Sequence, residues 1–434
     1  MILIYTHKIT NRLKYIFKII FNALIDSEIK FTTNKDEFNS YNGVKFSYTN
    51  RPIADELFFA CSSILFETGL EIKDIECFTF EDMPAFFKVS NSSVLRFDPF
   101  AASFYLVSRY EEYLPFIKDT HDRFEAKDSL AYKNNFLDKP VVNIWAEKIR
   151  SIINIRFGDV IESKKKFNYI PTIDIDNAFA YKNKGYIRTI GAILRALFKN
   201  DFADISKRLK VILNLEKDPY DTYNLQIELH KKYKLKPIYF ILFGEYGTND
   251  KNISPQNIEY RKLIKSLSDY TDIGIHPSYN SCKNIKTLKA EIDKLSELLN
   301  RDITKSRQHF LKMMFPETYR RLIELDIKHD YTMGYASEFG FRASICSEFN
   351  FYDIDFEYET PLIIHPFAFM DSTLKNYKKI NINNVIDILG PLISEVKKVN
   401  GTLISIWHNE SLGKKDNWDG WDNVYEEILR IATE

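Results

Sequence analysis

The chain has little cysteine and no pattern among the cysteines it has. Its four cysteines, Cys61, Cys77, Cys282 and Cys346, are widely spaced over 434 residues, and no two of them form a CxxC pair. Small secreted domains that depend on disulfides carry cysteine at a much higher density. We therefore expect reduced, buried thiols in a cytoplasmic protein.

The chain also lacks a net charge, because its 60 Lys and Arg are balanced by 60 Asp and Glu. Proteins that bind nucleic acids gain affinity by neutralising phosphates and releasing counterions, which requires a surplus of basic residues. No such surplus exists over the whole chain. We therefore expect no nucleic-acid partner.

Long uncharged apolar runs are missing as well. Near the N-terminus, Lys8, Arg12, Lys14 and Lys18 interrupt each apolar stretch before it reaches the length of a signal-peptide core. Elsewhere no apolar run reaches the roughly 18 residues that a membrane-spanning helix requires. The sequence predicts neither an export signal nor a membrane span.

What the chain does contain is core material, with 45% hydrophobic and 15% aromatic residues. Its length suits two domains of roughly 100–200 residues each. Residues 1–135 combine strand-like runs with helical patterns, which predicts a small α/β domain. The runs are Met1–Tyr5 and Val44–Tyr48, and the helical patterns are Ile53–Phe66 and Phe100–Tyr113.

A linker and a bridging helix are predicted next, over residues 136–166. The segment Lys118–Lys139 is polar and lacks periodicity, as expected of a loop. Pro140 then precedes a helical pattern at Val141–Ile155. The domain boundary is therefore expected between Lys118 and Lys166.

From residue 167 to 434, short apolar runs alternate with amphipathic stretches, which is typical of a parallel sheet or barrel. The predicted strands are Phe167–Ile173, Pro237–Phe243, Asp272–Ile275, Ile303–Ser306, Arg342–Cys346, Pro361–Ile364 and Thr402–Trp407. The predicted helices are Tyr223–Tyr233, Ile258–Leu267, Ile285–Leu299, Thr318–Leu325, Val385–Val399 and Trp421–Ala432. The predicted fold class is α/β, with an irregular (β/α)7-type barrel following the smaller domain.

Chemically active residues stand directly after four of these predicted strands. They are Asp174 and Asp176, His276, Arg307 and His309, and His408. Parallel barrel strands point their carboxyl ends to the same face, where active sites are assembled. Two carboxylates, three imidazoles and a guanidinium are therefore expected to meet in one basin.

This set of side chains suits a metal site. Imidazole nitrogen and carboxylate oxygen are ligands of catalytic Zn²⁺, which keeps a water in its open position. The ion lowers the pKa of that water to roughly 7, so that a carboxylate outside the coordination sphere can act as a base. The strand-end residues therefore predict metal-assisted hydrolysis.

These residues resemble the motifs of the polysaccharide deacetylase family (the NodB-homology domain, carbohydrate esterase family four), over about Phe167 to the C-terminus. The Thr-Ile-Asp-Ile-Asp run ending at Asp176 resembles the first motif, which implies that Asp174 is the general base and Asp176 a metal ligand. His276 resembles the first of two histidines in the second motif. The position of the second histidine holds Asn280.

The remaining motifs complete the resemblance. Arg307-Gln-His309 resembles the third motif, whose arginine orients the base, with a histidine where the family usually has proline. We infer that His309 supplies the missing metal-binding imidazole. Ile-Trp-His408 resembles the fifth motif and implies that His408 is the general acid, in keeping with an unperturbed pKa of about 6.5. The fourth motif has only Asp353 and Asp355 as candidate counterparts.

The resemblance implies a hydrolase that uses a divalent metal, in the first place Zn²⁺, to remove an acetyl or other acyl group from an amino sugar or glycan. Two alternatives stay open. A catalytically degenerate barrel would only bind carbohydrate, as the departure at Asn280 suggests, and a related hydrolase would cleave non-sugar C–N bonds. The N-terminal segment is similar to an uncharacterised domain in a Bacteroidetes-like branch of such deacetylases.

The proposed site residues also have structural interpretations. An Asp-x-Asp after a strand is often a solvated loop or a helix cap. His276 before Pro-Ser could be a turn residue, and His309 could pack beside Arg307. His408 could be a core histidine that is hydrogen-bonded to the backbone.

Other residues are interpreted structurally first. His365 is expected to be structural, although it ends an apolar run and could line the same basin. Trp418 and Trp421 could form a sugar-stacking wall or pack under the final helix. Arg109, with Glu111 and Glu112, is interpreted as a surface charge cluster on a helix, with an interdomain contact as the alternative.

Overall fold

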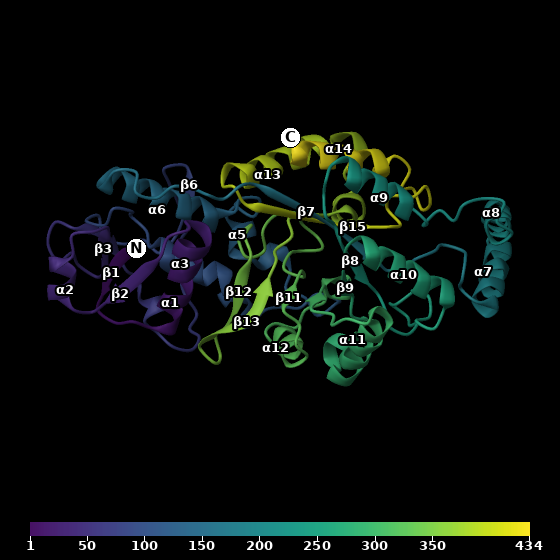
Figure 1. Cartoon of the computed structure of the whole chain (residues 1–434), viewed down its shortest axis with the longest axis horizontal. Coiled ribbons are helices and arrows are strands. Elements are labelled where there is room, and N and C mark those ends of the chain that lie inside the picture. The colour runs from purple at the N-terminus through teal and green to yellow at the C-terminus, as the bar shows by residue number, and fades with distance from the viewer.

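The computed structural model describes residues 1–434 and shows an elongated molecule (Figure 1). An N-terminal lobe forms one end, a large sheet with surrounding helices forms the middle, and a pair of helices stands at the opposite end. The fold is mixed α/β throughout. No helix is both long enough and apolar enough to cross a bilayer.

The N-terminal lobe is built on a four-stranded parallel sheet with the order β2-β1-β3-β4. Its strands, with a separate two-stranded ribbon, are β1 Ile2–Thr6, β2 Ile29–Thr32, β3 Lys45–Thr49, β4 Leu57–Ala60, β5 Phe78–Phe80 and β6 Met83–Ala85. Its helices are α1 Asn11–Phe17, α2 Lys35–Ser40, α3 Pro99–Val107, α4 Tyr110–Tyr113, α5 Leu130–Lys133 and α6 Val141–Phe157. A cluster of aromatic rings fills the space between this sheet and its helices, with Phe17 stacked on Phe100 at 4.2 Å.

One predicted helix of this lobe is wrong. The Ile53–Phe66 segment contains strand β4 and a short 3-10 turn at Ser63–Leu65 instead. Leu57–Ala60 is a continuous apolar run that is buried on both faces, and periodicity alone cannot distinguish such a strand from a buried helical turn. Lys118–Lys139 is mostly irregular, as predicted, apart from a 3-10 turn and α5.

Helix α6 contacts both lobes. Its Trp145 donates a hydrogen bond from Nε1 to the Pro84 carbonyl of the N-terminal lobe at 3.0 Å. Its Asn143 donates to Ser347 and accepts from the backbone N–H of Cys346, both in the C-terminal lobe. The helix therefore bridges the lobes while packing mainly against the first.

The C-terminal lobe is built on a nine-stranded sheet with the order β12-β13-β11-β10-β9-β8-β7-β15-β14. The strands are β7 Asn168–Ile175, β8 Ile238–Ile241, β9 Asp272–Ile275, β10 Lys305–Ser306, β11 His329–Asp330, β12 Phe349–Asp353, β13 Tyr358–Ile364, β14 Phe369–Met370 and β15 Thr402–His408. The helices are α7 Tyr186–Phe198, α8 Phe202–Ile212, α9 Tyr223–Lys232, α10 Ile258–Tyr270, α11 Ile285–Leu299, α12 Glu317–Glu324, α13 Val385–Lys398 and α14 Trp421–Thr433. All neighbouring strands are parallel except the β12–β13 pair.

The predicted barrel is present only as this large, mostly parallel sheet. The hydrogen-bonded order begins at β12 and ends at β14, and no strand ladder joins the two ends. The chain leaving β13 runs directly into β14, and Phe367 donates a backbone hydrogen bond to Met333 on the way. The parallel strands nevertheless direct their carboxyl ends to one edge, which is what the site requires.

One strand predicted for this lobe is wrong. The Arg342–Cys346 segment is a buried turn, with Ser344 in the left-handed region at φ 53°. The other six predicted strands and all six predicted helices form at or near their predicted positions. Strands β11 and β14 have only two residues each, too few to produce a periodic signal.

The interpretation of Arg109 as part of a surface charge cluster is also wrong. Arg109 and Glu112 are buried and lie 2.7 Å apart between Nε and Oε1. Glu112 also accepts two hydrogen bonds from Arg342 of the C-terminal lobe, and Arg109 donates to the Arg342 carbonyl. The alternative holds: this buried network joins the two lobes.

Candidate metal and catalytic site

The predicted strand-end residues converge at one edge of the sheet. Asp174 lies at the end of β7 opposite His408 of β15, and Asp176 follows β7 directly. His276 follows β9, and Arg307 and His309 follow β10. Five of these side chains line one cavity of 320 Å³, and Arg307 lies buried beside it: the lining members are Asp174, Asp176, His276, His309 and His408.

Three of these residues form a candidate ligand set for a metal ion. One ligand atom each from Asp176, His276 and His309 lies within 4.8 Å of the others. His276 Nε2 is 3.2 Å from Asp176 Oδ1, and His309 Nε2 is 3.4 Å from Asp176 Oδ2. Two imidazoles and one carboxylate with open space beside them match a catalytic zinc site.

The hydrogen bonds of the two histidines fix which nitrogen faces the cavity. His276 Nδ1 faces the Arg307 carbonyl at 2.5 Å, and His309 Nδ1 faces an Asp250 carboxylate oxygen at 2.8 Å. Both partners only accept, so each neutral ring carries its proton on Nδ1 and presents a bare Nε2. When both rings are neutral, two bare nitrogens face Asp176, whose buried Oδ1 then has no hydrogen-bond donor. A cation stabilises such a cluster of lone pairs, either as a metal ion or as a proton on one of the rings.

The charges around Asp176 keep it ionised. Burial alone would raise the pKa of this carboxyl, but the charge of His309 and the close ring nitrogens of His276 and His309 hold it well below its usual value. Burial likewise opposes the charged form of His309, whereas Asp176 and Asp250 raise its pKa to about 9. The surrounding carboxylates therefore favour positive charge at this position.

Asp174 of β7 is held by Arg307, which follows β10, three strands away in the sheet. Arg307 Nη1 donates to Asp174 Oδ1 at 2.9 Å and to Thr172 Oγ1 at 2.6 Å, while its Nε donates to the Tyr331 carbonyl. The guanidinium is fully buried and lies 4.5 Å over the Phe240 ring. This charge-assisted bond fixes the orientation of the Asp174 carboxylate next to the ligand set.

His408 has a carboxylate partner that the sequence did not reveal. Asp371, which follows β14, accepts from the Nδ1 of His408 at 2.8 Å and from its backbone N–H at 2.7 Å. Burial would lower the pKa of His408, but Asp371, followed by Asp176 and Asp174, raises it well above its usual value. His408 therefore holds a proton at neutral pH, with its Nε2 3.8 Å from Asp176 Oδ2.

Two further contributors were also missed. Asp250, in the loop after β8, positions His309, and Arg123 comes from the predicted loop Lys118–Lys139 to line the cavity. Arg123 donates to the Phe310 carbonyl at 2.7 Å, which brings the linker segment to the edge of the site. Neither residue stands at a strand end or in a motif, so no sequence signal distinguished them.

Several other candidates lie outside the cavity. Asp353 and Asp355 both pair with Arg320, and Asn280 is exposed. His365 contacts His329 at 3.0 Å and is not a lining residue. Trp418 and Trp421 are buried, with ring centroids 5.1 Å apart, so the packing alternative holds for this pair.

Comparison with known families gives one sequence match. The profile of a family of unknown function, DUF7033, matches residues 2–158, which agrees with the expectation of an uncharacterised N-terminal domain. The match does not specify a bacterial branch. No curated protein matches the chain.

Solved structures with a similar fold each cover 62% of this chain. A putative polysaccharide deacetylase from Mycobacterium smegmatis has 11% identity, 85% coverage of its own chain and a TM-score of 0.40. The polysaccharide deacetylase Bc1974 from Bacillus cereus has 11% identity, 86% coverage and a TM-score of 0.31. PuuE allantoinase has 9% identity, 88% coverage and a TM-score of 0.36. Likeness at this level assigns no activity, so function is argued from the site.

Proposed function

We propose that this protein is a metal-dependent hydrolase that removes an acetyl or related acyl group from an amino sugar or glycan. The observation that carries the proposal is the pair of bare Nε2 atoms, of His276 and His309, facing the Asp176 carboxylate. A divalent cation would accept a lone pair from all three groups at once. Zn²⁺ is the preferred ion because it favours imidazole and carboxylate ligands.

The remaining residues supply a base and an acid. A divalent cation bound here would polarise the acyl carbonyl and lower the pKa of a water molecule to roughly 7. Asp174, oriented by Arg307, takes the proton from the attacking water. His408, held protonated by Asp371, gives a proton to the departing amine or alcohol. Base and acid lie directly opposite each other on the neighbouring strands β7 and β15.

The substrate class rests on the motif resemblance and the shape of the cavity. A volume of 320 Å³ open to solvent suits one sugar unit of a larger glycan. The paired base and acid argue against a protein that only binds carbohydrate, because binding requires neither a buried arginine on the base nor a buried carboxylate on the acid. Hydrolysis of a non-sugar C–N bond remains the competing chemistry.

Metal analysis and acetate release test the proposal together. The purified protein should hold one zinc per chain and release acetate from N-acetylated or O-acetylated sugars. A chelator should abolish the release, and added Zn²⁺ should restore it. A panel that also contains cyclic amides separates the two chemistries. A protein that cannot be loaded with metal would refute the proposal.

His309→Ala should remove most of the bound zinc, because only Asp176 and His276 remain as ligands. The measurement is metal content per folded chain after equilibration with Zn²⁺. His365→Ala is the matched control, since His365 is buried to the same degree, 7% against 6% exposed, but lies outside the cavity. Unchanged zinc in the His309 variant would remove it from the ligand set.

Asp371→Asn should lower kcat on the order of 10²-fold with little change in KM or zinc content, because His408 loses the carboxylate that orients and charges it. Steady-state kinetics with the best acetylated sugar measures this split. Asp353→Asn is the control, since that carboxylate pairs with Arg320 away from the cavity. An equal loss in both variants would count against a role for Asp371.

A further inference from the structure

Helices α7 and α8 form a hairpin at the end of the molecule farthest from the N-terminal lobe (Figure 1). Only Ala196 in α7 and Val211 in α8 are fully buried. Arg188 attaches α7 to the loop after β8 by donating to the carbonyls of Asn252 at 2.8 Å and Lys251 at 2.9 Å. The hairpin is thus fixed to the body by its inner side and packs little of its surface.

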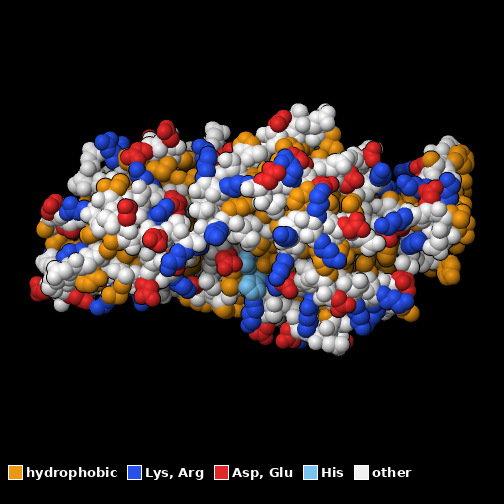
Figure 2. Space-filling model, turned by 45° about the horizontal axis from the view of Figure 1, so that its top comes forward, with side chains coloured by type: hydrophobic (Ala, Val, Ile, Leu, Met, Phe, Trp, Pro, Cys, Tyr) orange, Lys and Arg blue, Asp and Glu red, His pale blue; other side chains and the backbone are white.

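The outer side of the hairpin is apolar. Tyr186, Ile187 and Phe198 are 88–90% exposed. Further exposed apolar residues are Ile190, Leu194, Leu197, Phe202, Leu209, Ile212, Leu213 and Leu215. Hydrophobic side chains accordingly cover the right-hand end of the molecule in Figure 2. A continuous apolar surface of this kind marks an interaction site.

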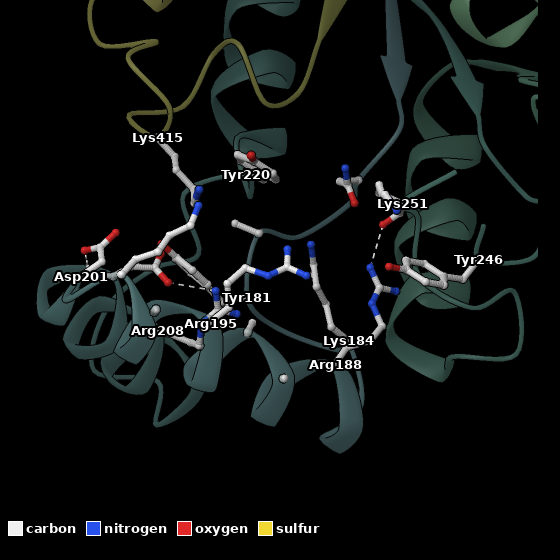
Figure 3. Close-up of a pocket in the computed structure, with 17 residues that line it drawn as sticks. Tyr181, Lys184, Arg188, Arg195, Asp201, Arg208, Tyr220, Tyr246, Lys251 and Lys415 are labelled. Atoms are coloured by element: carbon white, nitrogen blue, oxygen red, sulfur yellow. Dashed lines mark hydrogen bonds and ion pairs between the residues drawn. The ribbon is translucent and has the colours of Figure 1, made fainter. Parts of the chain in front are cut away.

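The inner side of the hairpin borders a basic cavity of 530 Å³ (Figure 3). Seven basic residues and two aspartates line it: Lys184, Arg188, Arg195, Lys199, Arg208, Lys251, Lys415, Asp201 and Asp204. The two carboxylates are already used. Asp204 pairs with Arg208 at 3.0 Å, and Asp201 caps α8 by accepting from the backbone of Asp204.

Several cations in this cavity therefore have no carboxylate partner. Lys184, Arg195 and Lys199 form no ion pair, and Figure 3 shows Lys184 and Arg195 pointing into the cavity. Burial, followed by neighbouring Arg188, lowers the pKa of Lys184 to about 8. This is the behaviour of a buried ammonium short of an anion. The cavity is built to receive negative charge.

The charge of the hairpin is distinct from that of the whole chain. Residues 182–217 contain nine Lys or Arg against three Asp or Glu, whereas the chain as a whole is balanced at 60 of each. Two copies of such a surface would repel each other in a symmetric dimer. An anionic lipid surface is complementary, since each Lys or Arg close to such a surface is attracted to it.

We propose that the α7–α8 hairpin docks this protein onto the surface of an anionic lipid bilayer, with its exposed apolar side chains in the interface and its surplus of cations attracted to the lipid phosphates. Amphipathic helices with aromatic and aliphatic residues on one face and cations on the other lie in the membrane interface in this way. The inference is independent of the proposed hydrolysis.

Vesicle sedimentation with the full chain tests the docking. The protein should sediment with vesicles of phosphatidylcholine mixed with phosphatidylglycerol about tenfold or more tightly than with phosphatidylcholine alone. High salt should weaken the difference. Equal sedimentation with both vesicles, or with neither, would overturn the proposal.

Two variants separate the apolar from the basic contribution. Ile187→Ser with Phe198→Ser should weaken binding to mixed vesicles about tenfold or more. The matched control is Ile72→Ser with Ile155→Ser, since both isoleucines are 83% exposed away from the hairpin. Lys184→Gln, Arg195→Gln and Lys199→Gln together should abolish the preference for anionic vesicles.

Other occupants give different results. If the hairpin contacted a second copy, the wild type would dimerise and Ile187→Ser with Phe198→Ser would restore the monomer without vesicles. If the cavity served free phosphate only, inorganic phosphate would raise the melting temperature of the wild type but not of the triple variant, and vesicles would not bind. Either result would overturn the membrane assignment.

Discussion

Asp174→Asn should lower kcat for acyl hydrolysis by about 10²- to 10⁴-fold while the protein keeps one zinc per chain. Asparagine has the shape of aspartate but cannot take a proton from water at neutral pH. The proposed ligands Asp176, His276 and His309 are untouched, so metal content should not change. Single-turnover kinetics and metal analysis on the same sample measure both quantities.

Measuring activity and metal content together shows whether Asp174 acts as a base or as a metal ligand. Asp174 Oδ2 lies 3.8 Å from His276 Nε2, close enough for a displaced carboxylate to reach an ion. If the Asp174 variant lost zinc along with activity, Asp174 would be a ligand. Asp272→Asn is the control, because Asp272 lies at the start of β9, at the opposite edge of the sheet, where it pairs with Lys305.

The residues of the site were predictable because they follow strongly apolar strands. Strands β7, β9 and β15 are mostly apolar, and a charged or imidazole side chain stands at or directly after the end of each. The inference that His309 replaces the histidine absent at Asn280 is compatible with the structure, which places His309 within reach of Asp176. Its role as a ligand stays a prediction until metal is measured.

The carboxylates that orient the histidines of the site were not predictable in the same way. Asp371 follows a two-residue strand, and Asp250 lies in an irregular loop, so neither is marked by periodicity. Both act through a hydrogen bond to a histidine far away in sequence, at separations of 37 and 59 residues. Only the fold brings such partners together.

The α7–α8 hairpin was not predicted from the sequence, for a different reason. Helices α7 and α8 have amphipathic patterns, but no predicted helix covered them. An apolar stripe is normally expected to face a core. Here Ile187 and Leu194 face outward, and Arg188 and Arg195 face the cavity, so the usual meaning of the pattern is reversed.

Arg342→Leu should lower the free energy of unfolding by about 3 to 5 kcal/mol, because it leaves the buried Glu112 carboxylate with fewer partners. Arg342 Nη2 lies 2.5 Å from Glu112 Oε2, and both side chains are at most 2% exposed. Urea unfolding followed by linear extrapolation measures the change. A single transition that shifts as a whole would show that the two lobes unfold together.

Two further variants show whether the lower free energy of unfolding comes from leaving the Glu112 carboxylate buried without its partner. Arg150→Leu removes an ion pair to Glu147 in which both side chains are about a quarter exposed, and should cost less than about 1 kcal/mol. Arg342→Leu combined with Glu112→Leu should be less destabilising than Arg342→Leu alone, since no carboxylate is left buried there. If the double variant lost as much or more, packing at the lobe interface rather than charge would explain the stability of the pair. Because Arg109 also contacts Glu112 and the Arg342 carbonyl, any non-additivity between the two substitutions measures how strongly this network couples the lobes.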